Sequence, residues 1–201
     1  MKSPSHSKHQ AILDGARQVF LAHGYSGASM EAIAEAAPVS KPTLYSHFGS
    51  KHELFVAVIA RQCETLFSTL SAATLSHSKP EDGLLAIAEA FTEVLYAEDS
   101  LALYRLLIAE QMNFPELGEQ VYRASAEPFN QLLASYLEAL HKQQLITVHD
   151  AVLSSQMLIG MLHGGSTHFR CLMGLQRGLS AEEKRQLVDG AVNLFLKGHR
   201  P

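Results

Sequence analysis

The sequence has few of the residues that build covalent or metal-stabilised frameworks. Only two cysteines occur among 201 residues, Cys63 and Cys171, and their separation matches no metal-binding or redox motif. Both lie in apolar helical patterns, which predict small buried side chains. We therefore expect no bound metal and no cofactor.

Long apolar runs are also missing. No stretch reaches the roughly 18 apolar residues of a membrane-spanning helix, and the first ten residues, MKSPSHSKHQ, lack the apolar centre of a signal peptide. The apolar content of 47% is nevertheless enough for a sizeable core. We expect a soluble, cytoplasmic protein that does not bind membranes.

Positive charge is scarce and unevenly distributed. The net charge of −4 excludes a protein coated all over with nucleic-acid-binding charge. Residues 1–60 carry five Lys/Arg and four Asp/Glu, whereas the rest of the chain carries eleven and sixteen. The N-terminal third is therefore the part that can approach a polyanion.

Alternating strand patterns are absent, and nearly every segment follows the helical period. About nine helices are expected, with no repeats and no low-complexity tract. Three of them are long, at residues 50–70, 116–143 and 149–174, and Pro128 predicts a kink in the second of these. The fold class is therefore all-α.

Two short helices near the N-terminus are joined by the residues APV. Ser29 is expected to cap the first and Ser40 the second, and two short helices with a tight turn form a helix-turn-helix. At about 100° per residue, Leu44 and Phe48 face the core and a polar, acid-poor surface faces outward. A helix of this size fits the major groove of DNA, although the residues alone leave an ordinary solvated helix as the alternative.

Residues 10–60 resemble the DNA-binding domain of the TetR family of bacterial repressors, most specifically in VSKPTLYSHFGSKHELF. The resemblance implies a double-stranded DNA operator as partner and contacts divided between phosphates and base edges. It implies that Ser29, at the cap of its helix, contacts a phosphate. It also implies that Lys41, Pro42 and Thr43 contact base edges. The full DNA-binding set that we predict is Ser29, Ser40, Lys41, Pro42, Thr43, Tyr45, His47 and Lys51, of which Tyr45, His47 and Lys51 would contact the backbone.

One residue departs from the family pattern. The family usually has glycine where this chain has Pro38, and glycine supplies a positive φ in the turn. Proline is locked near −65° and disfavours helical angles at the preceding Ala37. The turn must therefore differ locally, or the preceding helix must end one residue earlier.

The rest of the chain is expected to dimerise and to bind a ligand. Gly160 and Gly164 are four residues apart, and small residues let helices approach closely. In this family the last two helices pair with their copies as a four-helix bundle, although packing within one chain is the alternative. The predicted homodimer interface is Gly160, Gly164, Leu187, Ala191, Leu194 and Phe195.

A small-molecule site is predicted among the middle helices, because such sites are mostly apolar with few polar groups. Gln111 and His163 would supply polar contacts, and an ordinary core is the alternative for every residue of the set. The predicted lining is Phe67, Phe91, Leu95, Tyr104, Leu107, Gln111, Phe129, Met157, Met161 and His163.

These patterns together predict a transcriptional regulator rather than an enzyme. We expect a three-helix helix-turn-helix domain at 1–52 and a larger helical bundle at 53–201 that is controlled by a small, largely apolar effector. No nucleophile motif, phosphate loop or paired carboxylates stand out. His163 and His168, five apart on one expected helix, should be unable to share a metal. A helical protein-interaction module is the alternative.

Overall fold

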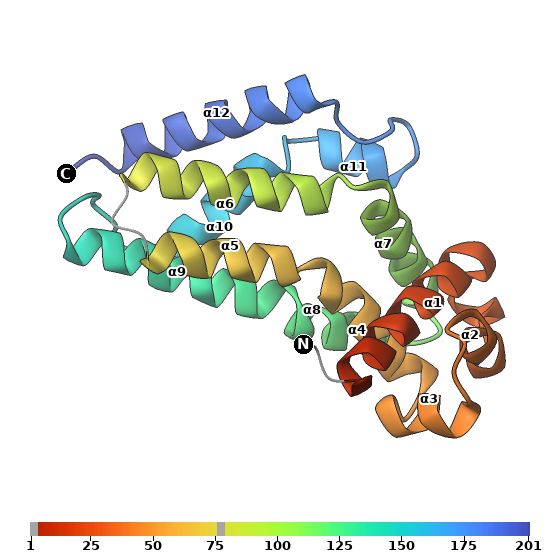
Figure 1. The fold of residues 1–201 in the computed structure, drawn as a ribbon. Helices are drawn as coiled ribbons and strands as arrows, with labels where there is room; N and C mark the ends of the chain where they lie inside the picture. The colour runs from red at the N-terminus through yellow and green to blue at the C-terminus, as the bar shows by residue number, and fades with distance from the viewer. Residues whose placement is uncertain (1–3, 76–78) are drawn as a thin grey trace. The chain divides into compact units, whose positions relative to one another are not determined.

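The structure is a computed structural model that describes residues 4–75 and 79–201, and over these residues it is all-helical, as predicted. Figure 1 shows the helices in chain order. The helices are α1 (Pro4–Gly27), α2 (Met30–Ala36), α3 (Lys41–His47), α4 (Lys51–Gln62), α5 (Glu64–Leu75), α6 (Pro80–Leu95), α7 (Glu98–Glu110), α8 (Pro115–Ala124), α9 (Ala126–Lys142), α10 (Ala151–Leu162), α11 (Thr167–Leu172) and α12 (Ala181–Gly198).

The chain folds into two compact units. The first comprises Met1–Gln62 and Ala102–Ser125, and the second comprises Cys63–Leu101 and Ala126–Pro201. This division differs from the expected boundary between residues 52 and 53. The reason is that apolar spacing reveals that a helix has a buried face but does not reveal which distant segment covers it.

The first unit is built on aromatic contacts between α1 and α4. The Phe20 ring meets the Phe55 ring edge-on with centroids 4.9 Å apart, and the Tyr25 ring lies 5.2 Å from that of Phe114. Such pairs stabilise a core beyond their buried area. Gly24, with φ of 71°, ends the regular part of α1, and α8 packs on α4.

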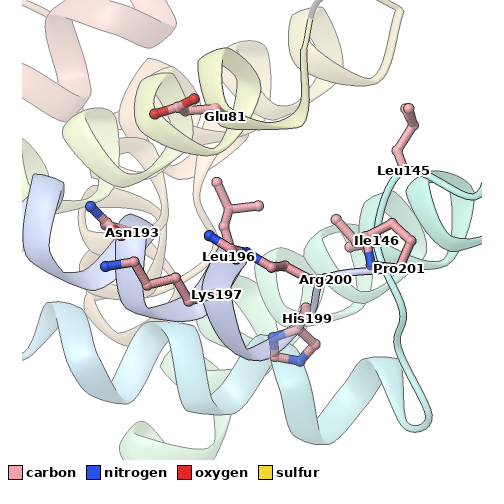
Figure 2. Close-up of a pocket in the computed structure, with 9 residues that line it drawn as sticks. All are labelled: Glu81, Leu145, Ile146, Asn193, Leu196, Lys197, His199, Arg200 and Pro201. Carbon is pink, nitrogen blue, oxygen red and sulfur yellow. The ribbon is translucent and has the colours of Figure 1, made fainter.

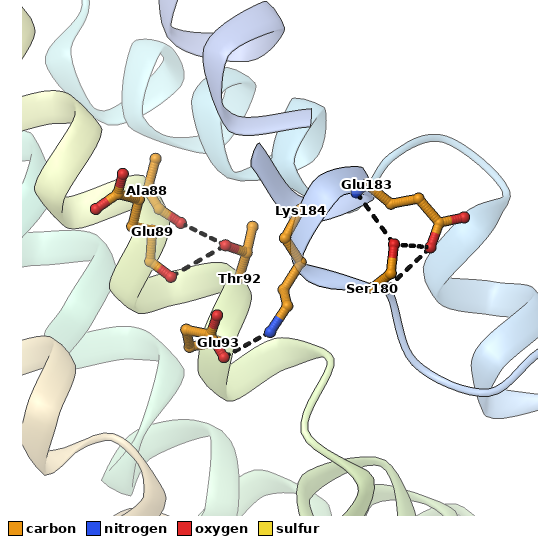
Figure 3. A network of polar contacts seen from close by, with 7 residues as sticks. All are labelled: Ala88, Glu89, Thr92, Glu93, Ser180, Glu183 and Lys184. Carbon is orange, nitrogen blue, oxygen red and sulfur yellow. Dashed lines mark hydrogen bonds and ion pairs between the residues drawn. The ribbon is translucent and has the colours of Figure 1, made fainter. Parts of the chain in front are cut away.

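The second unit is a bundle in which α6 packs against α5 and α12, and α9 against α5 and α10. Figure 3 shows how α12 is joined to α6: the Lys184 Nζ lies 2.6 Å from a Glu93 carboxylate oxygen. A capping box starts α12. The Ser180 hydroxyl accepts the Glu183 N–H, and the Glu183 carboxylate accepts the Ser180 N–H.

The helix predicted at 50–70 is interrupted at Cys63, so α4 and α5 are separate. The apolar stripe along this segment serves two cores. Residues up to Ile59 pack in the first unit, and Cys63 with its successors packs in the second. A continuous helical period therefore concealed a change of partner, and the expectation of one unbroken rod was wrong.

The helix predicted at 116–143 is broken at Ser125 rather than kinked at Pro128. Proline lacks an N–H and its ring clashes with the carbonyl four residues earlier, here that of Ala124. The helix accordingly ends at Ala124 and restarts at Ala126. At this break the Val121 carbonyl accepts both the Ser125 N–H at 3.0 Å and the Ser125 hydroxyl at 2.7 Å.

The helix predicted at 149–174 is also broken, so the described residues form twelve helices where about nine were expected. Gly164 and Gly165 have φ of 62° and 60°, and two consecutive residues of that conformation cannot continue a right-handed helix. The chain turns here between α10 and α11. The prediction that Gly160 and Gly164 lie on one helix face was therefore wrong.

Candidate functional site

The first short helix of the predicted motif begins as expected. The Ser29 hydroxyl accepts the Ala32 N–H at 3.1 Å, which satisfies one of the free donors at the start of α2. Met30 and Ile33 are buried in the core of the first unit. Ser29 itself is exposed, so its backbone and hydroxyl stay accessible at the surface.

The turn after α2 has an unusual residue at its centre. α2 ends at Ala36, and the Val39 N–H donates to the Ala34 carbonyl at 3.1 Å. This bond closes a helix-ending turn whose middle residue normally has positive φ and is normally glycine. Pro38 occupies that position with φ of 22°. The sequence-based expectation of a local change at Pro38 agrees with this strained conformation.

The second short helix, α3, is held by its ends and by one inward face. The Ser40 hydroxyl accepts the Thr43 N–H at 3.3 Å and lies 2.8 Å from the Thr43 hydroxyl. Leu44 is fully buried and Phe48, which follows α3, is 7% exposed. The predicted orientation of the helix is confirmed, and it leaves Lys41, Pro42 and Tyr45 exposed.

The residues predicted to contact DNA differ in how accessible they are. Tyr45 is 49% exposed, whereas Thr43 and His47 are half-buried. The Thr43 hydroxyl is already engaged by Ser40, and the Ser46 hydroxyl donates to the Thr43 carbonyl at 2.8 Å. Thr43 can therefore present its methyl group and the remaining hydrogen-bonding capacity of its hydroxyl to a base edge.

An acidic residue, absent from the prediction, accompanies the exposed cation of α3. The Lys41 Nζ lies 3.0 Å from a Glu31 carboxylate oxygen, and both side chains are more than half exposed. The hydrogen bond from Lys41 lowers the pKa of Glu31. Exposed ion pairs are weak, so this one can open when a stronger anion approaches. The two residues are ten apart and lie on different helices, so helical spacing in the sequence could not predict this ion pair.

Lys51 has a role inside the first unit that its sequence position did not indicate. Its Nζ donates to the carbonyls of Tyr25 and Ala28 at 2.8 and 3.0 Å and lies 4.6 Å from the centre of the Tyr25 ring. It thereby fixes the loop between α1 and α2. An ammonium group has three N–H donors, so one remains for a phosphate.

The ten residues predicted to line a ligand site are divided between the two units. Tyr104, Leu107 and Gln111 belong to the first unit, where Leu107 packs against the core and Gln111 is exposed. Met157 is 54% exposed on α10. The remaining six lie within the second unit: Phe67, Phe91, Leu95, Phe129, Met161 and His163.

An aromatic cluster forms in the second unit around His163. The Phe91 ring stacks on Phe129 with centroids 5.5 Å apart and meets the His163 ring edge-on at 5.8 Å. The His163 and His168 rings lie 4.9 Å apart, because the chain turns between them. The expectation that these two side chains diverge around one helix was wrong. Two imidazoles alone still fall short of a metal site, and the described residues contain no group of three or more metal-binding side chains.

Polar groups in this cluster are largely withdrawn from water. The Tyr96 hydroxyl donates to the His163 carbonyl at 2.8 Å. Burial, and to a lesser extent the charge interaction with Cys171, raises the Tyr96 pKa to about 12. Burial, and to a lesser extent the charge interaction with His163, lowers the pKa of His168 to about 4. The His168 Nε2 is buried without a hydrogen-bond partner among the described residues. His168 is therefore neutral at pH 7.

Cavities described in the second unit lie away from this cluster. Figure 2 shows one of about 290 Å³ at the end of α12, bordered by Lys197, His199 and Arg200. Another, of about 260 Å³, includes His141 and His149 in its lining. Neither is lined by a residue predicted to bind ligand.

The predicted dimer interface is only partly exposed. Ala191 and Phe195 are 6% and 2% exposed and pack in the core of their own unit, so the prediction that they face a second copy was wrong. Gly160 is exposed and Leu194 is 63% exposed, whereas Leu187 is half-buried. The helical period correctly indicated an apolar face on α12 but did not distinguish its inner side from its outer side.

The exposed side of α10 is unexpectedly apolar. Val152, Leu153 and Met157 are 57%, 47% and 54% exposed, and no heavy atom would meet a side chain added at Gly160. Sequence reasoning assigned Met157 to a cavity because its apolar character suits either place. Among the described residues, no helix is both long and apolar enough to cross a membrane.

Comparisons with known proteins agree with this architecture. Residues 12–58 match the model of bacterial regulatory proteins of the tetR family, and residues 82–201 match the C-terminal domain of AefR-like transcriptional repressors. The HTH-type transcriptional activator FasR of Mycolicibacterium smegmatis is 35% identical over 119 residues, which are 59% of this chain and 53% of FasR. The chain thus spans about half the length of that curated relative.

Two solved structures are similar along nearly the whole chain. A TetR-family transcriptional regulator from Mesorhizobium loti MAFF303099 has a TM-score of 0.84 and 29% identity over 100% of both chains. The flavonoid-responsive regulator FrrA has a TM-score of 0.72 and 29% identity, covering 96% of this chain and 97% of its own. With one family model matching more than half of its residues, the chain belongs to the TetR family of bacterial transcriptional regulators.

Proposed function

We propose that this protein is a cytoplasmic transcriptional repressor that binds a roughly palindromic operator as a homodimer. The proposal depends on the orientation of α3. Leu44 is buried beneath this helix, and its exposed surface contains Lys41, Pro42 and Tyr45 but no acidic residue of α3. A helix of this kind enters the major groove, and two-fold protein symmetry requires two-fold symmetry in the site.

Base readout in this proposal is assigned to Lys41, Pro42 and Thr43, and backbone contact to Ser29, Tyr45, His47 and Lys51, with Ser40 fixing the start of α3. The test is a genomic selection with the purified protein followed by footprinting of the recovered sites. Thr43→Ala should change the preference at one base pair in each half-site. If wild-type protein shows no preference over competitor DNA, the proposal fails.

Homodimerisation is proposed to use the outer side of α10 and α12. Val152, Met157 and Leu194 are large apolar side chains that are at least half exposed, and Gly160 would allow a second helix to approach closely. Large apolar side chains exposed in such numbers are a reason to expect an interface. Sedimentation velocity would measure the state directly, and a monomer at micromolar concentration would contradict the proposal.

A small, largely apolar ligand is proposed to bind near the cluster of Phe91, Phe129 and His163. Stacked aromatic rings with a few polar atoms at one end are typical of small-molecule sites. FrrA, which resembles this chain along its length, is responsive to flavonoids, and this supports an aromatic or otherwise flat apolar effector. The His163–His168 pair would orient one polar group of that effector.

A route from ligand to DNA is proposed through α7 rather than through one continuous helix at 50–70. The chain re-enters the first unit in α7, and Glu110 at its end accepts hydrogen bonds from the Ser26 hydroxyl at 2.6 Å and the Ser26 N–H at 3.3 Å. A displacement of α7 would therefore reach the loop that Lys51 also holds.

The ligand proposal is tested by titrating candidate effectors against the protein with and without operator. A coupling of about 1–3 kcal/mol would change ligand affinity roughly 5–150-fold, and operator affinity by the same factor. Equal ligand affinity in both titrations would contradict control of DNA binding. Phe91→Ala should weaken ligand binding without changing the operator affinity of the ligand-free protein.

A further inference from the structure

The cation at the start of α3 is paired with an acid of the helix before it. The Lys41 Nζ lies 3.0 Å from a Glu31 carboxylate oxygen, and the two side chains are 57% and 52% exposed. The hydrogen bond from Lys41 lowers the pKa of Glu31, so this carboxylate is ionised at pH 7. The proposed DNA-binding surface therefore carries a negative charge beside one of its base-reading residues.

Both partners are placed by the buried faces of their helices. On α2, Met30 and Ile33 are buried in the core of the first unit, whereas Glu31 between them is exposed. On α3, Leu44 is fully buried and Lys41 is exposed. The packing of α2 against α3 thus keeps the two charged groups within reach of each other.

An ammonium group paired in this way responds differently to phosphates and to bases. Lysine ordinarily binds phosphate as a point charge, but a carboxylate 3.0 Å away neutralises that charge and repels the incoming anion. The O6 and N7 atoms of guanine are neutral acceptors in the major groove. The two ammonium N–H groups that Glu31 does not occupy can bind these acceptors without bringing a second anion to the carboxylate.

We propose that Glu31 is a positioning residue that directs Lys41 to a guanine edge and away from the DNA backbone. The proposal rests on the DNA binding proposed above and names the base that Lys41 reads. Glu31 itself contacts no DNA: it holds the ammonium group and cancels much of its attraction for phosphate. Removing the charge of Glu31 therefore weakens base preference and strengthens attraction to DNA of any sequence.

The test measures affinity for the selected operator and for a non-specific duplex across a salt titration, and base preference by selection from a randomised site. Glu31→Gln removes the charge and keeps the size of the side chain. Glu35→Gln is the matched control, because it is the same substitution one turn further along α2, at an exposed carboxylate that is not the partner of Lys41. Glu31→Gln is also made in a Lys41→Ala background, and melting temperatures check that every variant is folded.

Wild type should prefer guanine at one base pair of each half-site, and Glu31→Gln should reduce that preference about 5-fold or more. Freeing the lysine for a phosphate steepens the slope of log affinity against log salt by about 0.9, so Glu31→Gln should lose about 3-fold more affinity than wild type between 50 and 200 mM salt on the non-specific duplex. Glu35→Gln should keep the wild-type base preference and change affinity equally on both duplexes. In Lys41→Ala protein, Glu31→Gln should leave base preference unchanged.

The outcomes separate this inference from the proposed function. If Glu31→Gln keeps the wild-type preference and the wild-type slope, Glu31 does not direct Lys41, while the operator preference of wild type stands. If Glu31→Gln shifts preference equally in the Lys41→Ala background, Glu31 contacts a base itself and the inference is wrong. If Glu35→Gln reproduces the effects of Glu31→Gln, general charge is responsible and the inference is equally wrong. A wild-type protein without any sequence preference would contradict the proposed function together with this inference.

Discussion

The two units present opposite chemistry to their surroundings. On α3 of the first unit, Lys41, Pro42 and Tyr45 are exposed above a buried Leu44, whereas the outer side of α10 and α12 exposes Met157 and Leu194. The polar, cationic surface of a helix is hydrated in water, and an anion can replace that water. An exposed apolar face is stabilised only by being covered. These two surfaces are the ones that we propose for binding DNA and for binding a second copy of the chain.

The interiors differ in the same way. In the first unit a cation, Lys51, is held by two carbonyls and an aromatic face. In the second unit two imidazoles, His163 and His168, lie together with one buried nitrogen unpartnered among the described residues. Contacts of a charged side chain therefore fix the loop next to the proposed DNA-binding helices, whereas two imidazoles lie in the proposed ligand region.

The largest effect is expected from placing a charge on the apolar surface. Leu194→Glu should give monomers and weaken operator binding by about 100-fold or more, because the two half-sites are then bound separately. Sedimentation and a gel-shift titration measure both. Leu132→Glu, at a 43% exposed position on α9, is the control and should remain dimeric. A dimeric Leu194→Glu protein with wild-type affinity would place the interface elsewhere.

The second effect concerns acid stability. His168 has a folded-state pKa of about 4, below the ordinary value near 6.5. The unfolded chain therefore takes up a proton first as pH falls, and stability is lost progressively from about pH 6.5 towards pH 4. His168→Phe should remove up to about 3 kcal/mol of that loss, measured by urea unfolding at pH 7 and pH 4.5. An unchanged pH dependence would show that His168 is accessible to protons when folded.

The third effect distinguishes two lysines of the first unit. Lys51→Ala should lower the free energy of unfolding by about 2 kcal/mol, since it leaves the carbonyls of Tyr25 and Ala28 without this donor. Lys41→Ala removes only an exposed pair and should cost less than about 1 kcal/mol. Both should weaken DNA binding. Equal melting temperatures for the two variants would contradict the structural role of Lys51.

The smallest effect is expected at the turn between α2 and α3. Pro38→Gly should raise the free energy of unfolding by about 1–2 kcal/mol, because glycine adopts positive φ without strain and restores an N–H to the turn. Thermal unfolding measures it, with Pro42→Ala at the start of α3 as a comparison that should not stabilise. A destabilised Pro38→Gly protein would mean that proline's restriction of the unfolded chain outweighs the strain.

Sequence reasoning predicted well where one local pattern determined the structure. Ser29 and Ser40 cap helices as expected, and Leu44 faces inward, because capping and helical period act over a few residues. It failed where distant contacts decide. The break at Cys63 follows from a change of core, and Phe195 is buried by partners that no local pattern names.

Predictions about the sites themselves depended on the resemblance to a family more than on spacing. That resemblance singled out α3, but it gave no sign of the ion pair between Lys41 and Glu31 or of the contact between His9 and Phe48. The His163–His168 pair was missed because its geometry depends on positive φ at two glycines. A helical wheel assumes a regular backbone and cannot anticipate such a turn.

The central claim is that the polar surface of α3 reads a two-fold DNA site in a dimer closed by the apolar surface of α10 and α12. The most direct measurement is sedimentation velocity of the protein with its selected operator and with a scrambled duplex of equal length and composition. The account predicts two protomers on the operator and affinity at least about 1,000-fold higher than for the scrambled duplex. Equal affinity for the two duplexes, or a single protomer on the operator, would contradict it.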